Sequence, residues 1–347
     1  MSADIVCFTS FTYAYVSRAR VLRQSLRAVH PEWPVWAVVI DEPPPGVDAA
    51  AALGEFDGVL KLADLGIAGG LDWLLRHDVV EACTAVKGQA LRLLLKRGAG
   101  AVLYFDPDVA VFNRLDPVLA ALAGGSIVLT PHQLAPNEHA VAVRDNEAGS
   151  LAYGVFNLGF IGVRNDIAGR AFADWWADRL GEACFDDPAS GLFTDQKYCD
   201  LVPGLFPATM VLRDPGCNVA SWNVSRRRLA FDDTGTITVN GAPLRFYHFT
   251  KIGGAGDLMT ERYGGDNVEV FEVWNWYKRA EHAMRRETVP AGYWHYGRFA
   301  DGRMISRALR LWWRGRPDLM GVLADPFVGL PGWIEEHEGG RKEALLF

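Results

Sequence analysis

Two aspartates separated by a single proline, Asp106-Pro107-Asp108, directly follow the apolar run 101–105. Two carboxylates this close repel each other unless a cation lies between them. Ligands of open α/β sheets bind beyond the carboxyl ends of the strands, so a strand that ends in two carboxylates puts charge where a ligand would bind. Alternate residues of an extended chain point the same way, which predicts that Asp106 and Asp108 converge. Their oxygens favour Mg²⁺ or Mn²⁺, ions that bridge to substrate phosphates.

The segments around this motif alternate between strand-like and helix-like patterns. Apolar runs of strand length cover 4–9, 34–40, 58–62, 101–105 and 126–130. Helical spacing of apolar residues covers 15–26, 79–96 and 118–122. This alternation predicts an α/β fold with a mostly parallel sheet and helices on both faces. Beyond residue 155 the pattern becomes mixed, with strands expected at 155–163, 209–213, 236–239 and 244–249 and helices at 167–180, 194–201 and from 268 onward.

Composition narrows the class of protein further. The chain has 347 residues, 22% of them charged, and a formal net charge of -7, so there is no general electrostatic case for nucleic-acid binding. Five cysteines without a CxxC pair argue against a disulfide framework and favour a reducing compartment, which predicts a cytoplasmic location. The sequence has neither a signal-peptide pattern nor an apolar run near the roughly 20 residues that a membrane helix needs.

A family resemblance rests on six segments that occur in a set order. They are Phe8-Thr9-Ser10, Thr84-Ala85-Val86-Lys87, Asp106-Pro107-Asp108, Phe156-Asn157-Leu158-Gly159, Thr194-Asp195-Gln196, and Tyr247-His248 followed by Lys251 and Gly253 to Gly256. Over about 4–257 the chain resembles the GT-A glycosyltransferases, especially retaining enzymes of glycosyltransferase family 8 such as glycogenin and the bacterial galactosyltransferases, and it is similar to bacterial polysaccharide enzymes. The resemblance implies a Rossmann-like mixed sheet flanked by helices in residues 1–267, with a helical extension over 268–347. After His248 the chain departs from the family pattern, because Lys251 comes three residues later and no Pro-Trp pair follows.

The resemblance also implies an activity and a set of site residues. The activity is metal-dependent transfer, with retention, of a sugar from a UDP- or GDP-sugar to a glycan, lipid-linked or protein acceptor. The implied metal ligands are Asp106, Asp108 and His248, and the histidine nitrogen suits Mn²⁺ better than Mg²⁺. The implied donor-binding residues are Phe8, Thr9, Ser10, Lys87, Asp106, Asn157 and Lys251; the implied catalytic residues are Asp195 and Gln196, and Asn218 lies on the acceptor side.

Several of these residues have a plain structural explanation as well. Lys87 fits a solvated helix face, and Thr194 and Asp195 are good helix-capping residues. Asn218 ends a segment, 214–218, with the composition of a turn. For the acidic motif itself the plain alternative is a surface turn, since Asp and Pro are common there.

The end of the chain carries a basic pattern. Arg303, Arg307, Arg310 and Arg314 recur at helical spacing, with apolar residues beside them. Such a helix either lies on an anionic membrane, predicting a peripheral contact through 303–316, or presents a solvated arginine face while its apolar side packs on the protein.

Two other functions compete with glycosyl transfer. A phosphohydrolase of the haloacid-dehalogenase type also has Asp-x-Asp after an apolar strand, with the first Asp as nucleophile. That family places the motif near the start of its domain, whereas residues 4–105 precede it here. A catalytically silent sugar-nucleotide or glycan-binding module would keep the fold but lose the metal ligands, and the joint presence of Asp106, Asp108 and His248 argues against it.

Overall fold

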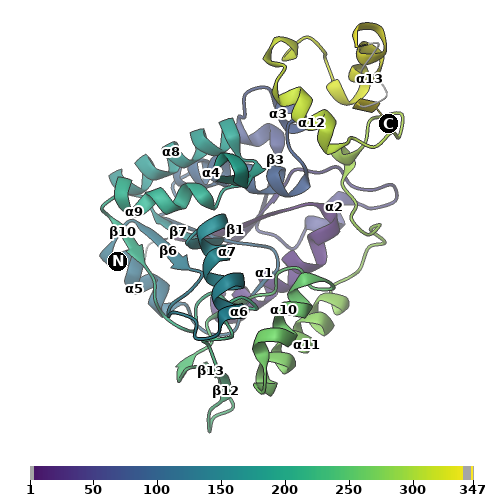
Figure 1. The fold of residues 1–347 in the computed structure, drawn as a ribbon. Helices are drawn as coiled ribbons and strands as arrows, with labels where there is room; N and C mark the ends of the chain where they lie inside the picture. Colours follow the sequence, from purple (N-terminus) through teal and green to yellow (C-terminus); the bar gives the residue numbers. More distant parts are fainter. Residues whose placement is uncertain (1–3, 339–344, 347) are drawn as a thin grey trace.

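A seven-stranded mixed sheet forms the centre of the protein, in a computed structural model that describes residues 4–338 and 345–346 (Figure 1). The strand order is β10-β6-β7-β4-β1-β2-β3. The bounds are β1 Ile5–Phe11, β2 Val35–Val39, β3 Gly58–Lys61, β4 Ala101–Phe105, β6 Ile127–Pro131, β7 Phe156–Arg164 and β10 Thr209–Val211. Neighbouring strands are parallel except where β7 lies antiparallel between β4 and β6. The predicted α/β fold with a mixed sheet flanked by helices is confirmed.

The strand that leads to the acidic motif is buried on both faces. Val102 and Tyr104 of β4 belong to one hydrophobic cluster, whereas Leu103 and Phe105 belong to the cluster on the opposite face. This alternation is the pattern of a central strand covered by helices on both sides. The strand is therefore a fixed support for the two aspartates that follow it.

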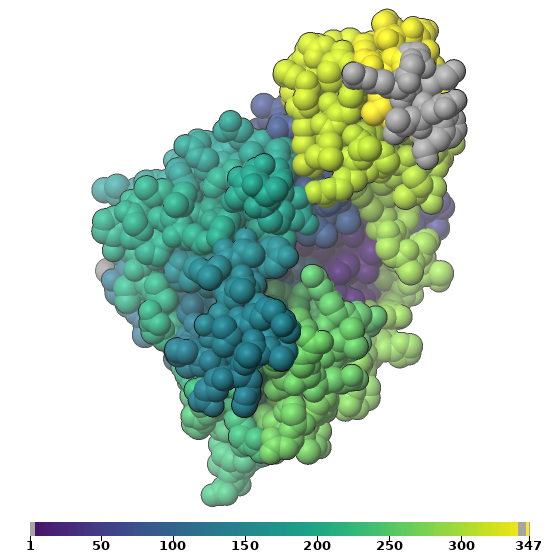
Figure 2. Space-filling view, viewed as in Figure 1, coloured from purple at the N-terminus to yellow at the C-terminus, as the bar shows by residue number. Residues whose placement is uncertain are grey.

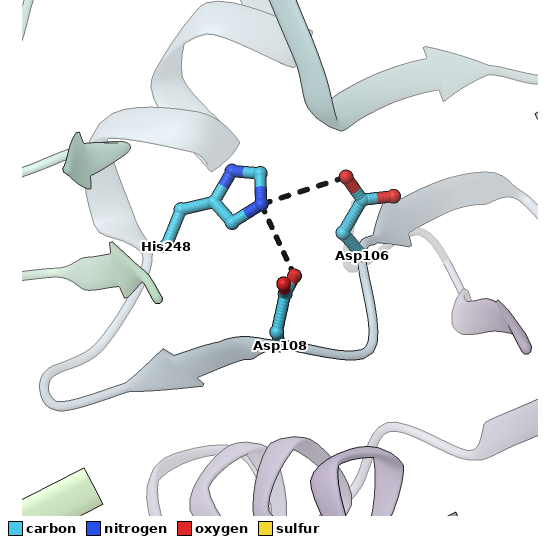
Figure 3. A group of neighbouring side chains, drawn as sticks. All are labelled: Asp106, Asp108 and His248. Atoms are coloured by element: carbon cyan, nitrogen blue, oxygen red, sulfur yellow. Dashed lines mark ion pairs between the residues drawn. The ribbon is translucent and has the colours of Figure 1, made fainter. Parts of the chain in front are cut away.

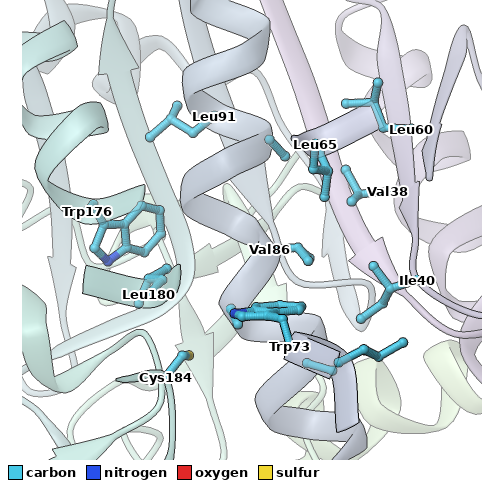
Figure 4. Packing of buried hydrophobic residues seen from close by; sticks show 14 of the residues in the cluster. Val38, Ile40, Leu60, Leu65, Trp73, Val86, Leu91, Trp176, Leu180 and Cys184 are labelled. Atoms are coloured by element: carbon cyan, nitrogen blue, oxygen red, sulfur yellow. The ribbon is translucent and has the colours of Figure 1, made fainter. Parts of the chain in front are cut away.

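Helices α4 (Val79–Lys96) and α8 (Ile167–Ala183) cover one face of the sheet. Figure 4 shows α4 between Trp176 and Leu180 on one side and Val38 of β2 and the following Ile40 on the other. The helices approach closely at Gly88, where an added Cβ would lie 2.7 Å from the Cα of Ala177. The opposite face is covered by α1 (Val16–Val29) and α5 (Asp116–Gly124), whose buried residues share the second cluster.

The start of α4 is fixed by its cap. The Asp78 carboxylate accepts hydrogen bonds from the backbone N–H groups of Val80 and Glu81, and the Glu81 carboxylate in turn accepts one from the backbone N–H of Asp78. This capping box satisfies donors that a helix start otherwise leaves unpaired. It fixes the turn from which α4 runs beneath the candidate site.

A small second sheet brings residues 246–248 to the acidic motif. Its order is β11 (Val219–Ala220), β15 (Phe246–His248) and β5 (Val109–Val111). Strand β15 runs antiparallel to β5, with His248 paired opposite Val109. The backbone N–H of Phe249 also donates to the carbonyl of Asp108, at 2.8 Å. Strand pairing therefore positions His248 beside Asp108.

The remaining elements are short. They are the helices α2 Ala49–Leu53, α3 Gly70–Leu75, α6 Ala140–Ala142, α7 Ala148–Tyr153, α9 Val202–Leu205 and α10 Ala255–Gly264, and the strands β8 Asp186–Asp187, β9 Leu192–Phe193, β12 Leu229–Phe231, β13 Ile237–Val239 and β14 Ala242–Pro243. Short 3₁₀ helices cover Tyr13–Tyr15, Leu62–Leu65, Pro188–Ser190, Lys197–Leu201, His295–Gly297 and Pro317–Leu319, and a π-helical turn covers Val143–Glu147. The helix expected over 194–201 is thus reduced to the 3₁₀ turn Lys197–Leu201.

The segment after residue 267 lies in two separate places (Figure 1). Helix α11 (Val268–Ala283) packs with α1, and its buried Trp274 and Tyr277 join the cluster that contains Tyr247 of β15. Helices α12 (Arg307–Arg314) and α13 (Pro326–His337) lie near α3 instead. The boundary at residue 267 stays a prediction, but α11 shares its core with the strand that carries His248.

The arginine pattern near the end of the chain does not form a free basic face. Helix α12 begins at Arg307, so Arg303 lies outside it. Arg310 is 3% exposed and donates to the carbonyls of Leu75, His77 and Tyr296. Arg314 likewise donates to the carbonyl of Arg76 and to Glu81. The expectation of a solvated arginine face is therefore wrong, and the predicted membrane contact through 303–316 loses the basic face on which it rested.

No helix among residues 4–338 and 345–346 combines the length and the apolar character that crossing a bilayer requires.

Candidate active site

A cavity of about 340 Å³ opens where β1 and β4 end and β7 begins. Its lining combines residues from the first strand, from α4, from the acidic motif and from the segment after β15. Figure 2 shows a hollow on this side of the molecule, with N-terminal residues in purple on its floor. Because β7 is antiparallel to β4, its first residues meet the last residues of β4 at the same edge. The cavity thus lies at the edge predicted for ligand binding.

The two aspartates converge through a turn. The backbone N–H of Val109 donates to the carbonyl of Asp106 at 3.1 Å, and Pro107 and Asp108 form the turn between β4 and β5. The expectation of an extended segment with both side chains on one side is therefore wrong in its geometry. The two carboxylates converge as predicted, because the turn also brings both of them into the cavity.

His248 completes a three-residue cluster with these aspartates (Figure 3). Its Nε2 lies 3.1 Å from Asp108 Oδ1 and 3.6 Å from Asp106 Oδ2. One ligand atom from each of the three side chains falls within 4.8 Å of the others. Asp108 and His248 are 7% and 4% exposed, so this charge is concentrated in a poorly solvated place.

The protonation of the cluster reflects its charge. Burial lowers the pKa of His248, but Asp108 and Asp106 outweigh it and raise this pKa above its ordinary value. Burial raises the pKa of Asp108, but His248 and Arg18 outweigh it and hold this pKa below its ordinary value. The carboxylates therefore favour a cation at this point, and two carboxylate groups with an imidazole nitrogen form a donor set that fits a divalent transition ion such as Mn²⁺.

Lys87 lies inside the protein wall of the cavity. Its Nζ is 2.8 Å from Asp195 Oδ2, 3.0 Å from Asp106 Oδ1 and 3.0 Å from the carbonyl of Leu158, and the residue is 2% exposed. Burial lowers the pKa of Lys87, but the two carboxylates outweigh it and hold this pKa well above its usual value. The explanation of Lys87 as a solvated helix residue is therefore wrong, and the helix cap proposed for Asp195 is replaced by a buried ion pair.

Asn157 and Gln196 lie in one hydrogen-bond network at the start of β7. Gln196 Oε1 accepts from the backbone N–H of Leu158 at 3.2 Å, and its Nε2 donates to the carbonyl of Tyr153 at 2.9 Å. Asn157 Nδ2 lies 3.3 Å from Gln196 Oε1. Both amides line the cavity, and both are engaged with protein groups.

The other predicted site residues fall at different depths. Ser10 and Lys251 line the cavity. Phe8 packs in the core against Tyr104, and Thr9 is fully buried; neither is part of the cavity lining, and their donor-binding roles stay predictions. Asn218 is 1% exposed and does not line the cavity, although its Nδ2 donates to Asn157, so its acceptor role also stays a prediction.

Sequence reasoning missed several aromatic residues of the site. Tyr104 donates to Asp106 Oδ1 at 2.5 Å, and the Trp222 ring meets the His248 ring edge-on, with centroids 5.3 Å apart. Phe11 and Tyr15 line the cavity beyond Ser10. Tyr104 was open to prediction, since a residue two positions before Asp106 on a strand shares its face. Trp222 follows no periodic pattern that would have placed it there.

Comparison with known proteins gives distant similarities. No protein-family model matches the chain. It is similar to two uncharacterized proteins of Bacillus subtilis (strain 168): YfnF, 29% identical over 176 residues, and YfnD, 26% identical over 186 residues. These alignments cover 50% and 52% of this chain, which spans only 57% and 56% of the length of the two relatives.

Solved structures of glycosyltransferases are also similar. The galactosyltransferase LgtC, in complex with donor and acceptor sugar analogs, is 17% identical with a TM-score of 0.47, over 82% of this chain and 97% of its own. GlyE of Streptococcus pneumoniae TIGR4 is 14% identical with a TM-score of 0.42, over 81% and 64% of the two chains. Mouse xyloside xylosyltransferase 1 is 13% identical with a TM-score of 0.40, over 72% and 98%. Because these TM-scores are below 0.5, function is inferred from the residues of the site itself.

Proposed function

We propose that this protein is a GT-A glycosyltransferase that transfers a sugar from a nucleotide-sugar donor to a glycan, lipid-linked or protein acceptor. The observation that carries the proposal is the cluster of Asp106, Asp108 and His248 in a cavity at the carboxyl edge of the sheet. The buried Lys87 beside Asp106 adds a fixed positive charge to the same place. Cation-binding groups at this edge suit a substrate that carries phosphates.

The metal ligands of the proposed site are Asp106, Asp108 and His248, with Mn²⁺ preferred over Mg²⁺ because of the imidazole nitrogen. When bound, the ion supplies positive charge that stabilises the diphosphate leaving group. Lys251 lines the cavity close to His248 in sequence, which suits contact with the same diphosphate. Lys87 acts from within the wall, where it positions Asp106 and Asp195.

Retention of configuration remains part of the proposal. A double displacement needs a nucleophile, and the nearby Gln196 offers a neutral amide held by Leu158 and Tyr153. Asp195 is paired with Lys87 and 2% exposed, which ties up its charge. This arrangement supports a front-face reaction in which the leaving phosphate takes the acceptor proton.

A panel of UDP- and GDP-sugars, tested with and without Mn²⁺, examines the proposal directly. We expect one or two donors to raise the melting temperature only when Mn²⁺ is present, and to be hydrolysed slowly in the absence of an acceptor. Asp108→Asn keeps the size of the side chain but removes its charge, so it should abolish both effects. Donor binding that is independent of Mn²⁺ and survives this substitution would refute the metal-dependent proposal.

Two further measurements separate the competing functions. Release of phosphate from simple phosphomonoesters, lost in Asp106→Asn, would favour a phosphohydrolase. Metal-dependent donor binding with neither hydrolysis nor transfer would favour a silent binding module. The donor nucleotide and its sugar emerge from the same panel, and a cytoplasmic location stays a prediction.

A further inference from the structure

We infer that Asn157 is a positioning residue for the metal ligand His248, and that its amide oxygen orients the imidazole ring toward the two aspartates. This inference rests on the proposed function, because it concerns the same metal site. It differs from the role that the family resemblance implied for Asn157, which was a direct contact with the donor sugar. Only the positioning role predicts that removing the Asn157 side chain weakens metal binding in the absence of any donor.

The amide oxygen of Asn157 is the centre of the network. It accepts hydrogen bonds from the backbone N–H of Gly159 at 3.1 Å and from Asn218 Nδ2 at 3.0 Å. It also lies 3.1 Å from His248 Nδ1. A backbone N–H is only ever a donor, so its contact identifies this atom of Asn157 as the oxygen.

The identity of this oxygen determines that Nδ1 of His248 carries a hydrogen. An oxygen of an amide only accepts, so Nδ1 of His248 carries a hydrogen and donates it to Asn157. The opposite nitrogen, Nε2, then faces Asp106 and Asp108 and is the ring atom free to ligate a cation. Metal-ligating histidines commonly donate their other ring N–H to an oxygen that fixes the tautomer and the orientation of the ring.

The nitrogen of the same amide is also occupied. Asn157 Nδ2 lies 3.3 Å from Gln196 Oε1 and 3.2 Å from His132 Nε2. Burial lowers the pKa of His132 to about 4, so this ring is neutral and its Nε2 can accept a hydrogen bond. With both ends engaged by protein groups, Asn157 has no hydrogen-bonding capacity left over for a sugar hydroxyl.

Packing holds the His248 ring in the same orientation. A Cβ added at Gly159 would lie 2.4 Å from two atoms of that ring, so only glycine leaves room for it. The Trp222 ring meets it edge-on. Asn218, which donates to Asn157, adopts φ 55, a left-handed conformation that is unfavourable for most residues but tolerated by asparagine.

The deciding experiment measures Mn²⁺ binding without nucleotide, through the electron paramagnetic resonance signal of the free ion. Asn157→Ala removes the oxygen, and we expect the dissociation constant for Mn²⁺ to rise roughly 10–100-fold, the usual effect of losing a hydrogen-bond partner of a metal ligand. Asn157→Asp keeps an oxygen that can accept the same hydrogen bonds, so it should retain most of the affinity. Equal Mn²⁺ affinity in wild type and Asn157→Ala would overturn the inference and restore the sugar-contact role.

A metal-free measurement keeps the inference separate from the proposed function. In wild type, ¹⁵N NMR of the histidine rings should show a hydrogen-bonded Nδ1–H on His248, and Asn157→Ala should lose it. If wild type binds no Mn²⁺ but shows this signal, the proposed metal site fails while the orienting role stands. An Nδ1 without hydrogen in wild type overturns the orienting role. If Asn157→Ala does not fold, Asn157→Ser serves in its place, because its hydroxyl is too short to reach the ring.

Discussion

Lys87→Met tests whether the ion pair in the cavity wall is as buried as its surroundings indicate. Methionine fills a similar volume but carries no charge, so the substitution isolates the electrostatic contribution. Asp195 then keeps its carboxylate at 2% exposure without the ammonium that lies 2.8 Å away. Asp106 loses the same neighbour, at 3.0 Å, but its side chain is 25% exposed and open to water.

Two estimates give the size of the effect. Removing one partner of a buried ion pair typically costs about 3–5 kcal/mol. Alternatively, Asp195 takes up a proton, and protonating a carboxyl of ordinary pKa about 3.9 near pH 7.5 costs about 5 kcal/mol at most. Burial already raises the pKa of Asp195, which reduces this second figure. We therefore expect the free energy of unfolding to fall by about 3–5 kcal/mol.

Urea denaturation followed by tryptophan fluorescence measures this loss. Lys96→Met is the matched control, because Lys96 is an exposed residue at the end of the same helix, and the control should change stability by less than about 0.5 kcal/mol. The double variant Lys87→Met with Asp195→Asn removes both charges and should recover much of the loss. A single-variant loss below about 1 kcal/mol, typical of a surface pair, would refute the buried ion pair.

Three other substitutions test separate parts of the structure. Gly159→Ala drives a methyl group against the His248 ring, so it should destabilise the protein by about 1–3 kcal/mol in urea denaturation and weaken Mn²⁺ binding. An unchanged Mn²⁺ titration would contradict the close contact between Gly159 and His248. Burial lowers the pKa of His77 to about 3, so its contribution to stability is complete above about pH 6.5 and is lost as the pH falls toward 3. Between pH 7.5 and pH 5 this amounts to about 2 kcal/mol, so wild type should lose about 2 kcal/mol more stability than His77→Phe over this range; equal losses in both proteins would count against this role of His77. Arg310→Met leaves three backbone carbonyls without their charged donor, so the free energy of unfolding should fall by roughly 2–4 kcal/mol. Residues 284–306 should also become sensitive to limited proteolysis. If the variant resists proteolysis as well as wild type does, α12 docks without Arg310.

The elements nearest the acidic motif were predictable from sequence because their local signals agree. The helix 79–96 and the strand 101–105 match α4 and β4 residue for residue. Asp78 supplies a cap and Gly98 follows the helix, while β4 is an unbroken apolar run with both faces buried. In such segments periodicity, capping and burial all favour the same structure.

The direction of β7 and the burial of polar residues were beyond local reasoning. A strand that is buried on both faces shows no pattern that reveals its direction, so nothing in 155–163 indicated that it runs antiparallel to β4. Lys87 and Arg310 looked like surface residues because their partners, carboxylates for Lys87 and backbone carbonyls for Arg310, lie far away in sequence. Their burial depends on which carboxylates and carbonyls the tertiary fold brings to them, and spacing along one helix carries no information about that.

Backbone strain is concentrated where the proposed chemistry takes place. Among the described residues, the non-glycine residues with positive φ are Thr194, Asn218, Asn240 and Lys251. Thr194 and Lys251 line the cavity, and Asn218 supports the amide that orients His248. Such conformations cost of order 1–3 kcal/mol each and persist only where the surroundings enforce them. A fold selected for stability alone has no reason to gather three of them around one cavity, whereas a site that must hold two aspartates, a histidine and their partners in fixed positions does.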